Sequence, residues 1–368
     1  QLERKSMKKT PLFENNKKLN ADIIEFGSWY MPVKYSGIIE EHLNTRQKAG
    51  LFDTCHMGEI TIKGKGAFNT VQKLIPRNAE KFKNNKCYYS QICNEAGGII
   101  DDVVIFKFTD DEYLFVINSE TYEKDYEWIN ENKEQETVVE DISLKTGKVD
   151  VQGPDSRNIV NLFLGEGQKV DELKFYSFNK YKWKNIDIIV SRTGYTGELG
   201  YEIYSPAENI SDIWEDLLEK GKDFGIMPAG LGARDTLRLE MGYPLMGQDL
   251  DNKITPVEAG FGVLVDFEKE YFIGKQAMFN KIGKYKTPFI IERGGIARHN
   301  CEVFDKDNNL IGEVTSGTFS PSLKKAIGFA YCDKKLDIGE EVFFKVRERF
   351  IKGVVSKGPF VENTSLKN

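Results

Sequence analysis

Two adjacent acidic residues, Asp101 and Asp102, stand inside a run of β-branched and aromatic residues that follows Gly97 and Gly98. Two glycines mark a turn, and the run at 99–106 is typical of a strand. Neighbouring strand residues point to opposite faces, so whichever face is buried carries one carboxylate in with it. Desolvation would raise the pKa of that carboxylate toward the range that suits proton transfer. Alternatively, both acids lie at the first turn and face water.

A third acid, Glu202, follows the loop 193–200, which holds three glycines and three hydroxyl-bearing residues. A carboxylate can accept two parallel hydrogen bonds from an amidine-like ring edge, such as that of a pterin or a guanine. The alternative is a solvent-facing residue of an amphipathic strand. Arg234 could offer a forked donor to a carboxylate or carbonyl. Equally, Arg234 and Arg238, four residues apart, could share a solvated helix face.

Three further residues, Tyr89, Asn118 and Tyr195, border predicted strands, where the wall of a ligand site would lie. Packing in an aromatic core is the competing interpretation for the tyrosines. The adjacent Cys55 and His56 suggest a thiol nucleophile with its base. A catalytic Cys–His pair usually joins distant segments, and strand neighbours face opposite ways, so we do not expect this pair to act together.

Mixed helices and strands must position these residues. The segments 88–93 and 99–108 are predicted as a hairpin with its turn at 94–98, and residues 51–62 as one strand. Further strands are expected at 113–117, 149–152 and 186–192, and helices at 38–49, 121–131, 210–218 and 233–241. The order lacks a regular βαβα rhythm, so the expected fold class is α+β rather than a doubly wound sheet.

The sequence pattern changes at about residue 283. Short apolar runs separated by Gly, Asn and Lys turns are expected as strands at 289–292, 302–304, 312–315, 326–331, 341–346 and 353–355. This spacing predicts a small all-β barrel or sandwich as the final domain.

Bulk composition excludes several classes of protein. The 368 residues suggest two or three domains, and 40% hydrophobic residues suffice for packed cores. A net charge of −6 gives no electrostatic case for nucleic acid or an anionic membrane, and no apolar stretch approaches the roughly 20 residues that span a bilayer. Five scattered cysteines and three distant histidines argue for a reducing compartment and against a metal site. We expect a cytoplasmic protein, or a mitochondrial matrix protein in a eukaryote.

Six segments in the same order resemble the aminomethyltransferase (T-protein) family of the glycine cleavage system, and the likeness extends from about residue 8 to 360. The segments are Thr10–Phe13, Gly50–Asp53 with His56–Glu59, Gly97–Asp102, Ser191–Glu198, Pro228–Asp235 and Glu313–Gly317. The resemblance implies a three-domain, cloverleaf-like folate-binding fold whose central opening holds tetrahydrofolate. The implied domains are an α+β folate-binding domain at 7–50 and 140–280, a second α+β domain at 51–139, and a C-terminal β-barrel at 283–362.

The resemblance also implies a reaction and its partners. Members of this family move the aminomethyl carbon from the lipoyl arm of the H-protein to tetrahydrofolate and release ammonia, without a metal. They associate loosely with the other glycine cleavage proteins. A folate-dependent demethylase of the same fold, acting on a small methyl donor, is the alternative.

The resemblance implies a role for each residue that falls on a functional position of the matched motifs. Asp102 matches the catalytic carboxylate, Glu202 the acid that binds the pterin edge, and Arg234 the arginine at the folate site. Other folate-lining positions are occupied by Met57, Tyr89, Val104, Val116, Asn118 and Tyr195. The chain departs from the family pattern at Cys55, Phe106, Phe175 and Val263, where relatives carry Ser, Tyr, Tyr and, in some, Trp. These departures put the shape of the site around the folate tail in doubt.

Overall fold

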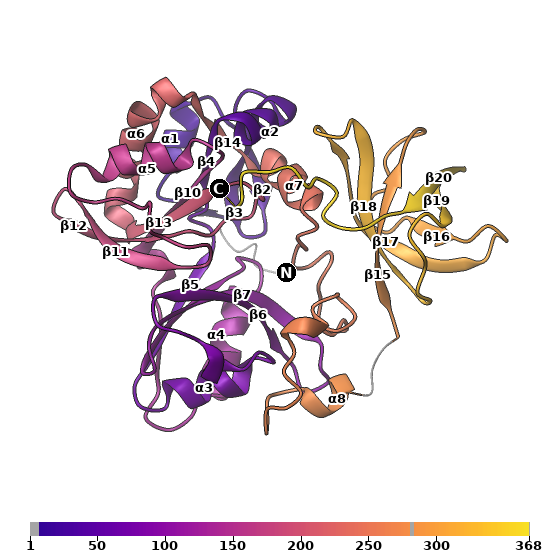
Figure 1. Cartoon of the computed structure of the whole chain (residues 1–368), viewed down its shortest axis with the longest axis horizontal. Helices are drawn as coiled ribbons and strands as arrows, with labels where there is room; N and C mark the ends of the chain where they lie inside the picture. The colour runs from indigo at the N-terminus through magenta and orange to yellow at the C-terminus, as the bar shows by residue number, and fades with distance from the viewer. Residues whose placement is uncertain (1–6, 280–282, 368) are drawn as a thin grey trace, which may run out of the picture.

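The computed structural model describes residues 7–279 and 283–367. Three lobes are visible in Figure 1: a six-stranded sheet with its helices, a five-stranded sheet with its helices, and a closed barrel. The predicted α+β class and the C-terminal barrel are therefore confirmed. Residues 280–282, at the junction expected between the folate-binding domain (7–50 and 140–280) and the C-terminal barrel, lie outside the described residues.

The six-stranded sheet has the order β11-β12-β13-β10-β4-β14, in which only the β14–β4 pair is parallel. Its strands are β4 (Ala49–Asp53), β10 (Thr146–Gln152), β11 (Phe178–Trp183), β12 (Ile186–Ser191), β13 (Gly200–Pro206) and β14 (Ile226–Ala229). The associated helices are α2 (Ile38–Gln47), α5 (Ser156–Leu164), α6 (Ile210–Lys220) and α7 (Leu231–Glu240). Helix α6 packs on the sheet through Ile213, Trp214 and Leu217, which recur at helical spacing and are fully buried.

A small N-terminal sheet adjoins this lobe. It has the order β1-β3-β2, from β1 (Lys8–Lys9), β2 (Asp22–Phe26) and β3 (Trp29–Lys34), with α1 (Phe13–Lys18) between them. Strand β3 packs against α7, so this small sheet lies beside the helix that carries Arg234.

The five-stranded sheet has the order β6-β7-β8-β5-β9. Its strands are β5 (Gly58–Lys63), β6 (Lys86–Cys93), β7 (Ile99–Thr109), β8 (Glu112–Ile117) and β9 (Val138–Asp141), and its helices are α3 (Ala67–Leu74) and α4 (Tyr122–Glu131). The predicted hairpin is confirmed, because β6 and β7 pair antiparallel around the turn at 94–98. Its core contains Ile60, Val103 and Phe115, all essentially without solvent exposure.

The prediction of a single strand over 51–62 was wrong. Residues 49–53 form β4 of the six-stranded sheet, and 58–63 form β5 of the five-stranded sheet. Between them the Asp53 carboxylate accepts the amide N–H of Cys55 at 3.0 Å, and the amide N–H of Met57 donates to the carbonyl of Thr54 at 3.2 Å. These local bonds bend the chain although its apolar alternation continues. The chain thus passes from one sheet to the other at 54–57.

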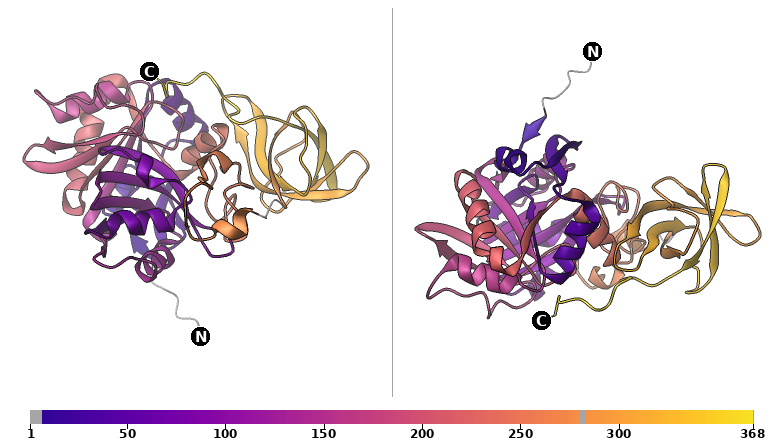
Figure 2. Two further views of the ribbon diagram at one scale, coloured as in Figure 1. Left: turned by 60° about the horizontal axis from the view of Figure 1, so that its bottom comes forward. Right: turned by 90° about the horizontal axis from the view of Figure 1, so that it is seen from above.

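The barrel closes in the order β15-β18-β17-β16-β19-β20. Its strands are β15 (Tyr285–Ile291), β16 (Glu302–Phe304), β17 (Leu310–Ser320), β18 (Lys325–Cys332), β19 (Glu341–Val346) and β20 (Arg349–Val355), and the short helix α8 (Lys275–Phe279) precedes it. Phe289 and Phe344 meet in its core with ring centroids 4.2 Å apart. Beyond β20 the chain returns to the first lobe (Figures 1 and 2), where the Ser365 hydroxyl and amide both donate to Glu198.

Within the described ranges, no helix is long and apolar enough to cross a membrane.

Candidate active site

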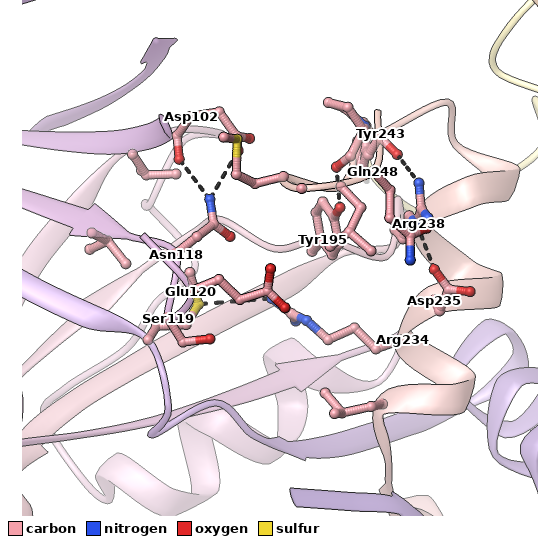
Figure 3. A pocket seen from close by; sticks show the side chains of 18 of the residues that line it. Asp102, Asn118, Ser119, Glu120, Tyr195, Arg234, Asp235, Arg238, Tyr243 and Gln248 are labelled. Atoms are coloured by element: carbon pink, nitrogen blue, oxygen red, sulfur yellow. Dashed lines mark hydrogen bonds and ion pairs between the residues drawn. The ribbon is translucent and has the colours of Figure 1, made fainter. Parts of the chain in front are cut away.

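A cavity of about 690 Å³ lies where the two sheets, the N-terminal strands and the segment 242–261 meet. All nine residues predicted for the catalytic and folate-binding site line it: Met57, Tyr89, Asp102, Val104, Val116, Asn118, Tyr195, Glu202 and Arg234. Figure 3 shows Asn118 pointing toward Asp102 on one side, and Arg234 extending from α7 on the other. Sheet register brings several together, because Tyr89 pairs with Val104 across β6–β7 and Val104 with Val116 across β7–β8. Their roles toward a ligand remain predictions.

The Asp102 carboxylate is held at both oxygens. The Tyr89 hydroxyl donates to Oδ2 at 2.9 Å, and the Asn118 side-chain N–H donates to Oδ1 at 2.9 Å. Burial and then the charge of Asp101 raise the pKa of Asp102 from its ordinary value of 3.8 to about 7, although both hydrogen bonds act against this rise. A carboxyl group with this pKa is present in both protonation states near neutral pH, as a general acid–base catalyst requires.

Asp101 lies on the opposite face of β7 and has no solvent exposure. Its Oδ2 accepts the backbone N–H of Asn118 at 2.9 Å, and its Oδ1 accepts the Asn118 side-chain N–H at 2.8 Å. One amide thus connects the two acids. Burial also raises the pKa of Asp101. The alternative in which both acids face water is wrong, since Asp101 is enclosed and Asp102 is half-buried at the cavity wall.

Glu202 is 7% exposed, so it is not a solvent-facing strand residue. Its Oε2 accepts hydroxyl hydrogen bonds from Thr193 at 2.7 Å and Tyr204 at 2.8 Å, and its Oε1 accepts Lys148 Nζ at 3.1 Å. Tyr204 shares a face with Glu202 because the two are separated by one residue on β13. Three donors fix this carboxylate in the cavity wall.

A buried charge network supports Glu202 and Arg234. Asp150 lies opposite Glu202 in the β10–β13 pair, and its Oδ1 is 2.6 Å from Lys148 Nζ. Arg234 Nη1 reaches Asp150 Oδ2 at 3.0 Å. Burial alone would raise the pKa of Asp150, but Lys148 and Arg234 hold it below its ordinary value. Sequence reasoning missed Lys148 and Asp150. They alternate with two valines along a strand, so the two charged side chains share one face, and this pattern was a signal of a buried ion pair.

The two arginines of α7 differ in surroundings. The Arg234 guanidinium lies 4.8 Å from the ring centroid of Tyr195, whose hydroxyl donates to the Pro244 carbonyl. Arg238 is 1% exposed and is bound to Asp249 at 2.7 Å and to the Ser316 hydroxyl at 2.9 Å. Neither arginine lies on a solvated helix face. Arg238 connects α7 to the barrel, while Arg234 brings positive charge to the cavity.

Comparisons with known proteins match this architecture. A family model described as the GCVT N-terminal domain matches residues 12–269, and one described as the glycine cleavage T-protein C-terminal barrel domain matches residues 287–362. The chain belongs to the glycine cleavage T-protein family. It is 44% identical to an aminomethyltransferase of Halothermothrix orenii, over 96% of this chain and all of that protein. It is also 44% identical to an aminomethyltransferase of Caldanaerobacter subterraneus subsp. tengcongensis, over 95% of each chain.

A solved structure agrees in fold with this T-protein family member. The crystal structure of glycine cleavage system aminomethyltransferase T from Bartonella henselae superposes with a TM-score of 0.90 at 30% identity, covering 98% of this chain and 99% of that one. The predicted resemblance to the T-protein family and the assignment to a family of transferases are therefore confirmed.

Three departures from the T-protein pattern lie away from the cavity. Phe106 is fully buried against Phe178 and Tyr204, and Val263 is 94% exposed. Phe175 is 47% exposed, whereas its neighbour Tyr176 lines the cavity. The departures at these three positions therefore change no side chain that lines the cavity.

The fourth departure, Cys55, is buried and its thiol donates to the Lys148 carbonyl. Burial and then the nearby Asp53 raise the pKa of this thiol well above its usual range, which opposes a nucleophilic role. His56 lines the cavity, and burial followed by the charges of Arg234 and Lys148 lowers its pKa to about 3. It is therefore a neutral imidazole.

Sequence reasoning also missed part of the wall. Phe261, Tyr243 and His299 line the cavity from the segment after α7 and from the barrel. Phe261 contacts the Tyr89 ring at a centroid distance of 5.3 Å. No local pattern marks these residues, because they reach the cavity only through the packing of segments that lie far apart along the chain. Within 7–279 and 283–367, no cluster of three His, Cys, Asp or Glu side chains is placed to hold a metal ion.

Proposed function

We propose that this chain is the tetrahydrofolate-dependent aminomethyltransferase of glycine cleavage, which transfers the aminomethyl carbon from the lipoyl arm of the H-protein to tetrahydrofolate and releases ammonia. The observation that carries the proposal is Asp102, a half-buried acid poised near neutral pH in the wall of a large cavity. Membership of a family whose curated relatives are named aminomethyltransferases supports the same reaction. Those names do not favour the alternative of a folate-dependent demethylase.

The residues of the cavity fit a reduced pterin. Such a ring presents N–H donors on one edge, and the Glu202 carboxylate, which three protein donors fix at the cavity wall, keeps an acceptor position on Oε1 for one of them. Tyr89, Phe261 and Tyr195 supply aromatic surface for the flat ring. Arg234 adds a cation that suits a carbonyl or carboxylate.

Tetrahydrofolate, when bound, supplies the nitrogens that receive the carbon. Asp102 provides the proton chemistry, because carbon–nitrogen cleavage needs a proton on the departing amine and removal of one from the attacking nitrogen. Its two oxygens are fixed by Tyr89 and Asn118, so the carboxyl group exchanges protons without changing orientation. General acid–base catalysis of this kind is worth about 10²–10⁴ in rate. Glu202 and Arg234 bind the folate and orient it.

The direct test is incubation of the purified protein with tetrahydrofolate and aminomethyl-loaded H-protein, with detection of ammonia and methylenetetrahydrofolate. Both products are expected, and H-protein without lipoate should give neither. A protein that instead demethylates a sulfonium or methoxy donor, and is inert toward loaded H-protein, would support the alternative. We place the reaction in the cytoplasm, where a reducing environment would keep the five free cysteines reduced.

A further inference from the structure

His56 is a buried polar residue in the wall of the cavity whose ring nitrogens the protein leaves without partners. It lines the cavity and is 7% exposed. Its Nδ1 is enclosed and has no hydrogen-bond partner. Within 7–279 and 283–367, no protein group forms a hydrogen bond with its Nε2 either. Buried polar groups in native proteins are paired as a rule, so this imidazole is a group that a bound molecule can satisfy.

The residue before His56 in the site, Thr54, connects it to the predicted pterin-binding acid. The Thr54 hydroxyl accepts a hydrogen bond from Lys148 Nζ at 3.2 Å, and the same ammonium reaches Glu202 Oε1 at 3.1 Å. The backbone N–H of Thr54 also donates to the Lys148 carbonyl at 3.3 Å. These bonds hold the crossing segment 54–57 against the strand that supports Glu202.

The residue after His56, Met57, connects it to the other side of the same wall. Its sulfur is 4.0 Å from Nη2 of Arg234, and both side chains line the cavity. Phe26, which also lines the cavity, meets the His56 ring nearly at a right angle with centroids 5.8 Å apart. The imidazole is thus held at the cavity wall between the surroundings of Glu202 and those of Arg234.

The ring presents a donor to the cavity. Burial, followed by the charges of Arg234 and Lys148, lowers the pKa of His56 to about 3, so at neutral pH the ring has one N–H and one lone pair. A proton on the enclosed Nδ1 would be a buried donor without an acceptor, which is rarer in native structures than an unfilled acceptor. The proton therefore belongs on Nε2, the one ring nitrogen left to meet a ligand.

We propose that His56 is a further ligand-binding residue, whose Nε2–H donates to the ring carbonyl of the reduced pterin while Glu202 accepts the N–H beside that carbonyl. A pterin ring carries these two groups on adjacent atoms, so one donor and one acceptor in the same wall match them. The inference rests on the proposed function. It deepens that function because it assigns a protein partner to one particular oxygen of the ligand.

The experiment compares His56→Phe, which keeps a ring against Phe26 and removes the N–H, with His56→Gln, whose side-chain amide places an N–H near the position of Nε2. Calorimetry measures the affinity of each protein for tetrahydrofolate and for its 4-amino analogue, which carries an amino donor in place of the carbonyl. The preference for tetrahydrofolate should fall about three- to tenfold in the phenylalanine variant, as expected for the loss of one neutral hydrogen bond. The glutamine variant should retain the preference.

A second measurement uses the wild-type protein labelled with ¹⁵N in its histidines. The chain has three histidines, and the signals of His56 are assigned by their loss in His56→Gln. NMR should show the proton on Nε2 in the free protein and a shift of this nitrogen when tetrahydrofolate binds. A proton on Nδ1, or an Nε2 signal that tetrahydrofolate leaves unmoved, would overturn the proposal.

A matched control is His299→Phe. His299 also lines the cavity, but it lies in the barrel lobe, and its Nδ1 is 2.9 Å from the Thr315 carbonyl. Its substitution should leave the preference for tetrahydrofolate over the 4-amino analogue unchanged. An equal fall in both phenylalanine variants would overturn a specific role for His56. An unchanged preference in His56→Phe would also overturn it and would favour Arg234 as the partner of the carbonyl.

The binding measurements need no turnover, so the two proposals can fail separately. A wild-type protein that shows the expected preference and shifts, yet releases no ammonia from loaded H-protein, would refute only the proposed function. An active wild type whose preference survives in His56→Phe would refute only the inference about His56. A protein that binds neither compound would refute both.

Discussion

Replacement of Asp102 by asparagine removes a charge and preserves shape. The carboxylate now accepts from Asn118 at Oδ1 and from the Tyr89 hydroxyl at Oδ2. An amide keeps both contacts if its oxygen faces Asn118 and its NH₂ donates to the Tyr89 hydroxyl, which can rotate to accept. The variant should therefore fold, retain its cavity and bind tetrahydrofolate, but lose the formation of methylenetetrahydrofolate.

The same substitution should stabilise the protein at alkaline pH. The pKa of Asp102 is about 3 units higher in the folded chain than its ordinary value, and each unit corresponds to 1.36 kcal/mol. A carboxyl group with a raised folded-state pKa lowers the free energy of unfolding as pH rises from the unfolded pKa to the folded one. The penalty is absent at pH 3 and complete at pH 8. Asp102→Asn should thus gain about 2–4 kcal/mol at pH 8 and nothing at pH 3.

Urea denaturation of both proteins at the two pH values measures this difference, and ammonia release measures turnover. If the two proteins differ in stability by the same amount at pH 3 and pH 8, the argument that burial destabilises the ionised form of Asp102 is refuted. Near-normal turnover with loaded H-protein would refute its catalytic assignment. Unchanged tetrahydrofolate affinity, measured by calorimetry, is the control that the cavity is intact.

Three further substitutions test neighbouring parts of the site. Tyr89→Phe removes a donor that lowers the pKa of Asp102, so the limb of the pH–rate profile that reports Asp102 should move up by about one pH unit. Glu202→Gln should weaken tetrahydrofolate binding about ten- to a hundredfold by calorimetry, and an unchanged affinity would count against pterin binding at this position. Arg238→Met leaves Asp249 buried without its 2.7 Å partner and should cost about 3–5 kcal/mol in urea denaturation, whereas a loss below 1 kcal/mol would contradict its role in joining α7 to the barrel.

Local pattern predicted much of the fold. Glycine-marked turns and β-branched runs located the β6–β7 hairpin and the strands of the barrel, because both signals act over a few residues. The strand period of two also placed Asp101 and Asp102 on opposite faces. The same period wrongly predicted one continuous strand over 51–62, because side-chain and backbone hydrogen bonds bend the chain at 54–57.

What the sequence determined by itself was the alternation of faces, the order of motifs and the family they belong to. Only the tertiary structure decided which polar groups meet: Asn118 between the two acids, and Lys148 and Asp150 beside Glu202. The physical reason is that local periodicity records which residues share a face, whereas partners distant along the chain are chosen by strand register and by the packing of one lobe on another.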